Sequence, residues 1–153
     1  VVVDTGGKAV SGADLIVHFD PKVLEATGSA IIKGKIFDEY PLISVDAKNG
    51  LVSISGVSSL NKSFKGSGQF ALMNFKAKIP GKTSLTVYFK QGSTIASNLV
   101  EAATSKNILE QVDNLELNIQ RKKFCLYFLL FTFSCWSFRR ISYVILRSCK
   151  WHI

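Results

Sequence analysis

Three side chains of different chemistry alternate along one short run of the chain. Asp14, Ile16 and His18 are spaced two residues apart within the sequence VSGADLIVHFDPKVLEA, residues 10–26. Because successive side chains of an extended strand point to opposite faces of a sheet, we expect all three on one face. An Asp in an otherwise aliphatic strand is unfavourable for strand formation, so something outside local structure favours it. An acid, an apolar group and an imidazole on one outward face predict a protein-binding patch.

The alternative interpretation of these residues needs no partner. Asp14 would then be a solvated residue that prevents the sheet face from associating. Ile16 would be a single exposed apolar side chain, which is common on protein surfaces.

Two serines of a second segment are further candidates for the patch. Ser53 and Ser55 lie in the sequence LVSISGV, residues 51–57. If Leu51, Ile54 or Val57 contributes to the core, the two hydroxyl groups lie on the outward face. The pattern leaves the register open, because apolar residues occur at both parities of this strand.

Catalysis and metal binding have little support in residues 1–120. This part of the chain has one His, no Cys and scattered carboxylates, so neither a nucleophile with its base nor a metal shell is predicted. Asp38 and Glu39 are adjacent and point to different sides if extended, so their spacing does not form a general acid and base pair. We therefore predict no catalytic residue, no metal site and no cofactor.

The charge of the chain is unevenly distributed. The formal charge is +8, yet residues 1–120 carry twelve Lys and eleven acids. Residues 121–153 carry four Arg, three Lys and no acid, with every Cys and Trp of the chain, whereas every Gly and Pro precedes them. We therefore expect one domain in residues 1–120 and a tail of different composition in residues 121–153. A nucleic-acid partner is not predicted, because residues 1–120 have no basic stripe interleaved with aromatic residues.

The element that positions the first three candidates is a strand with a clear core face. Leu15, Val17 and Phe19 alternate with them and are expected to point inward. Pro21 then ends the strand, because proline lacks a backbone N–H and cannot continue a ladder.

Turn signals divide the rest of residues 1–120 into short strands. Asn49-Gly50 favours the positive backbone angles of a tight turn and predicts one hairpin. Pro80-Gly81 predicts a turn of a second hairpin. Eight or nine strands with one apolar face each predict an all-β fold, two antiparallel sheets packed as a β-sandwich. The expected segments are residues 1–3, 10–19, 29–37, 42–45, 51–57, 69–79, 85–89, 99–103 and 112–119.

Three blocks of this sequence resemble the cohesin family, the modules that bind dockerin modules in cellulosomes and related surface assemblies. The blocks are VSGADLIVHFDPKVLEA, NGLVSISG and GQFALMNFKAKIPGKTSLTVYF, and the resemblance extends to about residue 120. It implies a nine-stranded antiparallel β-sandwich of jelly-roll type, with an N-terminal strand that is truncated in this chain.

The resemblance also implies a function. A cohesin-like module is extracellular or at the cell surface, is not an enzyme, and binds a dockerin-type partner that carries the calcium. Asp14 falls where the family presents an Asp to the dockerin. Family members tend to have a bulkier apolar residue near Ser55 and an Asn near Gly12, and both departures bear on dockerin specificity.

Two other functions are compatible with the same architecture. A carbohydrate-binding module or adhesin usually needs exposed aromatic rings, and residues 1–120 contain no Trp and only Tyr40 and Tyr88. A spacer domain of a surface protein would need no ligand of its own.

The tail allows three interpretations. Residues 124–138 are fifteen apolar or hydroxyl residues between basic clusters, which is short for a membrane-spanning helix of about twenty residues. The tail is therefore a short membrane anchor, a packed extension of the domain, or a peptide not native to this family, such as an out-of-frame translation. We expect that a chain without residues 121–153 still folds. It should also be more soluble, because the Phe and Trp residues of the tail have no predicted surface to cover them.

Overall fold

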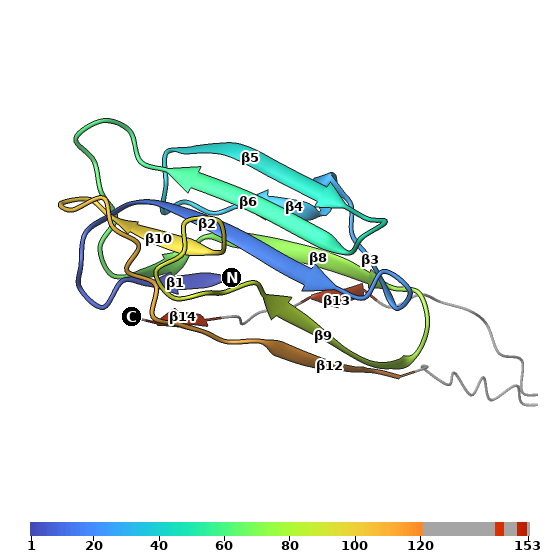
Figure 1. Ribbon diagram of the computed structural model, residues 1–153. Helices are drawn as coiled ribbons and strands as arrows, with labels where there is room; N and C mark the ends of the chain where they lie inside the picture. The colour runs from blue at the N-terminus through green and yellow to red at the C-terminus, as the bar shows by residue number, and fades with distance from the viewer. Residues whose placement is uncertain (121–142, 146–149, 153) are drawn as a thin grey trace, which may run out of the picture.

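The computed structural model describes residues 1–120, 143–145 and 150–152, the last two ranges by their backbone alone. Two layers of β-strands pack face to face around one hydrophobic core (Figure 1). The predicted β-sandwich is confirmed.

The first sheet has the strand order β12-β9-β2-β6-β5, and β10 also pairs with β2. β10 pairs with the first half of β2 and β9 with its last three residues, so both lie along the same edge of β2. All of these pairs are antiparallel. The strands are β2 (Val10–Phe19), β5 (Glu39–Asp46), β6 (Leu51–Val57), β9 (Gly81–Val87), β10 (Asn98–Glu101) and β12 (Leu115–Ile119).

The second layer consists of two short ladders that follow one another. One has the order β11-β14-β1-β7, and the other has the order β13-β8-β3 with β4 also on β8. Only Phe70 separates β7 from β8, so the two ladders share one nearly continuous run of chain. The elements are β1 (Val2–Asp4), β3 (Leu24–Glu25), the 3-10 helix η1 (Gly28–Ala30), β4 (Ile31–Lys33), β7 (Ser67–Gln69), β8 (Ala71–Ala77), β11 (Gln111–Val112), β13 (Tyr143–Ile145) and β14 (Lys150–His152).

The strand count differs from the expected nine. Residues 1–120 contain twelve strands, because three runs are interrupted. β3 and β4 both pair with β8 on either side of η1, β7 and β8 are separated by one residue, and β11 and β12 by two. If each interrupted pair is joined, nine runs remain.

The hairpin predicted at Asn49-Gly50 is present. β5 and β6 are antiparallel neighbours with Asp46 opposite Leu51. Gly50 has a φ of 68°, and a Cβ there would lie 2.0 Å from the carbonyl oxygen of Phe19. Only glycine fits this turn, which therefore fixes the register of β5 on β6.

The second predicted hairpin is wrong. β8 pairs with β3, β4 and β13 in the second layer, whereas β9 pairs with β2 and β12 in the first sheet. The chain crosses between the layers after Ala77, and the Lys78 N–H donates to the carbonyl of Val23 at 2.8 Å. Pro80-Gly81 does reverse the chain, but both strands bury alternate residues whichever sheet they join, so alternation could not reveal the crossing. Ile79, the last residue of the expected strand 69–79, is 50% exposed because β8 ends at Ala77.

The core face predicted for β2 is confirmed. Leu15, Val17 and Phe19 are buried, with exposures of 0%, 2% and 5%. The Phe19 ring packs edge-on against Phe75 of β8, with ring centroids 5.3 Å apart. This contact joins the two layers directly beneath the strand that carries the candidate residues.

The expectations for the tail lie mostly outside the described residues. β13 pairs with residues 74–76 of β8, and β14 runs parallel to β1 and antiparallel to β11. In the described part of the chain, no helix is long and apolar enough to span a membrane. The origin of the tail stays a prediction.

Candidate partner-binding face

The five residues singled out in the sequence lie together on the outer side of the first sheet. Asp14 of β2 is directly opposite Ser55 of β6, and Ile16 is opposite Ser53. His18 follows on β2, and its side chain is exposed. We call the outward side chains of β5, β6 and β2 the candidate face.

The register of β6 was left open by the sequence and is now fixed. Val52 and Ile54 are buried at 0% and 1% exposure, so Ser53 and Ser55 point outward as predicted. Leu51 and Val57 share the outward side with the serines, and Val57 is 38% exposed. The suggestion that either of them helps the core is therefore wrong. Pairing to β2, where Leu15 opposes Ile54, decides the matter.

The third strand of the candidate face, β5, was predicted from the sequence as a hairpin strand but not as part of the face. β5 places Leu42 opposite Ser55 and Ser44 opposite Ser53. Leu42 is 44% exposed, whereas its neighbour Ile43 on the other side of β5 is half-buried. Ser55 therefore lies between Leu42 and Asp14, and Ser53 lies between Ser44 and Ile16. The sequence signal was the hairpin turn, which sets these cross-strand pairs.

An aromatic pair borders the candidate face next to β9. The His18 ring meets Tyr88 edge-on, with ring centroids 6.1 Å apart. Tyr88 is 44% exposed, and its N–H donates to the Ile16 carbonyl at 2.8 Å. An open hollow of about 270 Å³ adjoins His18; its lining is His18, Phe19, Asp20, Lys82, Thr83, Ser84 and Thr86.

The carboxylate of Asp14 is held from the neighbouring strand. The Nδ2 of Asn98 on β10 donates to Asp14 Oδ2 at 2.9 Å, and the two residues are directly opposite each other. Asn98 is only 4% exposed, whereas Asp14 is partly buried. Asn98 was not identified from the sequence, because 84 residues separate it from Asp14.

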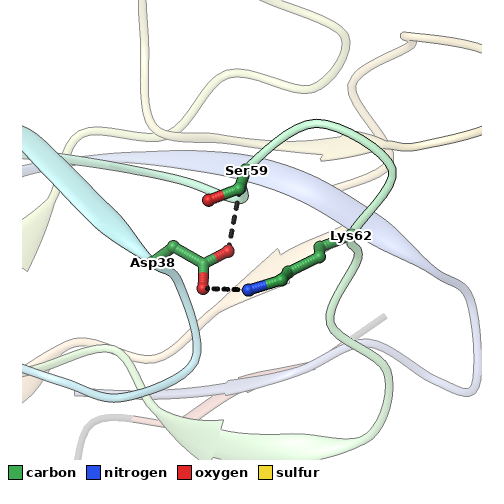
Figure 2. Close-up of polar contacts among 3 residues, drawn as sticks. All are labelled: Asp38, Ser59 and Lys62. Atoms are coloured by element: carbon green, nitrogen blue, oxygen red, sulfur yellow. Dashed lines mark hydrogen bonds and ion pairs between the residues drawn. The ribbon is translucent and has the colours of Figure 1, made fainter.

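A pinned loop closes one end of the first sheet. Asp38, just before β5, accepts the Ser59 N–H at 2.8 Å and the Lys62 ammonium at 3.1 Å (Figure 2). These two interactions, the Ser59 N–H first, lower the pKa of Asp38 below its ordinary value. The segment after β6 that contains Ser59 and Lys62, here called the pinned loop, is thereby tied to the start of β5. Both oxygens of the Asp38 carboxylate therefore hold this loop in place, and we do not count Asp38 among the candidates for a general acid or base.

The turn between β5 and β6 uses a second carboxylate in the same way. Asp46 accepts the N–H groups of Asn49 at 3.0 Å and Lys48 at 3.1 Å, and its other oxygen accepts the Asn49 side-chain amide. These bonds, with that to the Asn49 N–H first, lower the pKa of Asp46. Neither perturbed acid lies in a cleft with a second catalytic group.

A metal site would need clustered ligands, and a sugar platform would need exposed aromatic rings. No group of three His, Cys, Asp or Glu side chains gathers within the described ranges. Tyr40 is unsuited to a sugar platform, because its hydroxyl donates to the Phe70 carbonyl at 2.9 Å and burial raises its pKa. Tyr88 remains the exposed tyrosine of residues 1–120.

A family model for the cohesin domain matches residues 1–112. Among solved structures, the chain is similar to the third cohesin of ScaC from Acetivibrio cellulolyticus, solved in complex with the ScaB dockerin. The two chains are 15% identical, and the match has a TM-score of 0.58 and covers 76% of this chain and 81% of that one. A search of curated protein sequences found no match. At this identity, the structural likeness establishes a shared fold.

Proposed function

This chain belongs to the cohesin domain family, and from that premise we propose that it is a non-catalytic module that binds a dockerin-type module of another protein. The observation that carries the proposal is the family match over residues 1–112. The similar ScaC cohesin was solved with a dockerin bound, which supports the same class of partner. The binding role extends to Asp14, Ile16, His18, Ser53 and Ser55 as part of this proposal.

The chemistry of the candidate face suits a polar contact surrounded by apolar ones. Asp14 accepts hydrogen bonds, and Ser53 and Ser55 both donate and accept them. Ile16 and Leu42 supply apolar area on either side of the serines. Small side chains on the middle strand permit close approach of a partner element, and the flanking apolar groups exclude water from the polar contacts.

Calcium is assigned to the partner in this proposal. Calcium sites need six to eight oxygen ligands, and no acidic cluster of that kind occurs in the part of the chain that the structure describes. The family supports a secreted or cell-surface location for the module, because cohesins belong to assemblies of that kind.

The experiment is a calorimetric titration of the 153-residue chain with a panel of dockerin modules in Ca²⁺. We expect one or more dockerins to bind with a Kd in the micromolar range or tighter, and EDTA to abolish binding by unloading the dockerin. Absence of binding to every dockerin at micromolar concentrations would remove most of the support for the proposal.

A glycan array run on the same preparation tests the rival function. Retention of a glycan that is lost in Tyr88→Ala would favour a carbohydrate-binding module. If the chain binds neither a dockerin nor a glycan, the result would favour a spacer domain without a ligand of its own.

A further inference from the structure

Asn98 is a buried polar residue with one unsatisfied atom. Its side chain is 4% exposed, and its Oδ1 is buried with no hydrogen-bond partner among the described residues. Its Nδ2 donates twice, to Asp14 Oδ2 at 2.9 Å and to the Ala96 carbonyl at 3.2 Å. A buried acceptor without a donor destabilises a fold, so its presence calls for an explanation.

The orientation of the Asn98 amide is determined by its surroundings. Both groups that it contacts, the Asp14 carboxylate and the Ala96 carbonyl, are acceptors, so only the NH₂ end can face them. Turning the amide over would place its oxygen against two other oxygens. The side chain therefore satisfies Asp14 at the cost of its own Oδ1.

The backbone around Asn98 is fixed independently of its side chain. Ser97, which is 0% exposed, accepts the Ile16 N–H through its Oγ at 2.9 Å. The Ser97 N–H donates to the Tyr88 carbonyl at 2.9 Å. Asn98, the first residue of β10, thus projects from a backbone that is fixed on both sides, and its amide has little freedom to follow a moving carboxylate.

The two oxygens of Asp14 are consequently in different situations. Oδ2 is bound to Asn98, whereas no described residue donates to Oδ1. The outward neighbours of Asp14 are Ser55 across on β6, Asn98 on β10, and Gly12 and Ile16 along β2, none of which is charged. The carboxylate is held in one orientation with one acceptor available.

We propose that Asn98 is a positioning residue for partner binding: it fixes the Asp14 carboxylate so that Oδ1 is presented to the partner. This inference rests on the proposed function, since the partner is the dockerin-type module. Pre-ordering a charged acceptor before association lowers the entropy lost on binding. The unsatisfied Oδ1 of Asn98 is then a stability cost retained for recognition.

The first test is made on the free chain and needs no partner. Asn98→Leu keeps the approximate size of the side chain and removes the unsatisfied acceptor together with the amide donor. We expect its Tm to be equal to or higher than that of the unaltered chain. By NMR, the Asn98 side-chain NH₂ protons should be protected from exchange and lose protection in Asp14→Ala. Unprotected NH₂ protons in the unaltered chain would overturn the positioning role, whatever the chain binds.

The second test measures affinity for the Ca²⁺-loaded dockerin that binds the unaltered chain most tightly. Asn98→Leu should weaken binding roughly tenfold, as expected for a lost charge-assisted hydrogen bond. In an Asp14→Ala background it should have no further effect, because Asn98 acts through Asp14. Asn118→Leu, the same change on exposed β12 of the same sheet, is the matched control and should bind normally.

The third test uses Asn98→Asp, which places two carboxylates against each other. At pH 7 they repel, and we expect a loss of affinity larger than that of Asn98→Leu. As the pH falls, one proton is shared between them and a donor to Asp14 is restored, so the ratio of variant to unaltered affinity should rise toward one at pH 5. His18 lies four residues away, about 13 Å along the strand, and its contribution cancels in this ratio.

These outcomes separate the two proposals. If a dockerin binds and Asn98→Leu leaves its affinity unchanged, or if Asn98→Asp shows a flat ratio with pH, the positioning role is wrong and the binding function stands. If no dockerin binds, the proposed function fails. The inference that Asn98 positions Asp14 for a dockerin then fails as well. The NMR test still decides whether Asn98 orients the Asp14 carboxylate in the free chain.

Discussion

The outer surfaces of the two layers use their polar groups differently. On the second layer, Lys76 of β8 pairs with Glu25 of β3 at 3.8 Å, so its charges compensate each other. On the first sheet, the Asp14 carboxylate has a buried amide on one oxygen and no described donor on the other. The second layer pairs these two charges with each other, whereas the first sheet leaves one oxygen of Asp14, beside Ser55, without a described donor. This contrast supports the proposal that the partner binds the outer surface of the first sheet.

The largest effect is expected where both layers depend on one contact. Phe75→Ala removes a ring that is 1% exposed and packs on Phe19, and should lower the free energy of unfolding by about 3–5 kcal/mol. Chemical denaturation measures this directly. Leu60→Ala, at a side chain that is 91% exposed, should change it by less than about 0.5 kcal/mol. Similar values for the two variants would contradict the described core.

The next effect separates the two surfaces by affinity. Asp14→Ala should weaken dockerin binding about tenfold or more, because it removes the acceptor that the partner is proposed to bind. Its Tm should fall modestly, because the buried Asn98 amide loses one of its two acceptors. Lys76→Ala breaks the Glu25 ion pair on the other layer and should leave affinity unchanged. Unaltered affinity in Asp14→Ala would remove that residue from the site.

Deletion of residues 121–153 should affect the second layer alone. β13 and β14 pair with β8 and β1, and neither contacts the first sheet by strand pairing. We expect the shortened chain to unfold cooperatively and to bind dockerin within about twofold of the full chain, because β2, β5 and β6 keep their pairing. Circular dichroism melting and titration calorimetry check the two parts. Loss of cooperative unfolding would show that the domain needs its tail.

The smallest effect concerns the pinned loop. A carboxyl with a lowered folded pKa stabilises the fold above its unfolded value of 3.8, and this contribution is lost as the pH falls through the lower folded value. Asp38→Asn should therefore be slightly less stable than the unaltered chain at pH 7, and the difference should vanish in strong acid. Urea titrations across this range measure it. A difference that grows as the pH falls would have the wrong sign.

The two faces of β2 were predicted correctly, because one face carries only apolar side chains near its end and the other carries Asp14 and His18 beside Ile16. Leu15 and Val17 face the core, while Asp14 and His18 face outward, as alternation requires. β6 was ambiguous, because Leu51 and Val57 are as apolar as Val52 and Ile54. Pairing with β2 resolved it, and pairing is not encoded in β6 alone.

Long-range relations were beyond the sequence pattern. The contact between Asn98 and Asp14 spans 84 residues, and nothing in the local sequence around Asn98 indicates a buried amide. The crossing from β8 to β9 was missed for a related reason, since a turn signal gives a change of direction and not the sheet that follows. The crossing and Asn98 both required knowledge of which strands are neighbours.

The most direct test of the central claim places the same bulky charge on each outer surface. Ser53→Arg inserts it in the middle of the candidate face, and Ile32→Arg inserts it on the second layer at a side chain that is already 51% exposed. With both variants shown to be folded by their melting curves, dockerin affinity is measured by calorimetry. The account predicts that Ser53→Arg abolishes binding and that Ile32→Arg binds normally. Normal binding by Ser53→Arg would contradict it, and loss of binding in Ile32→Arg would place the partner on the second layer.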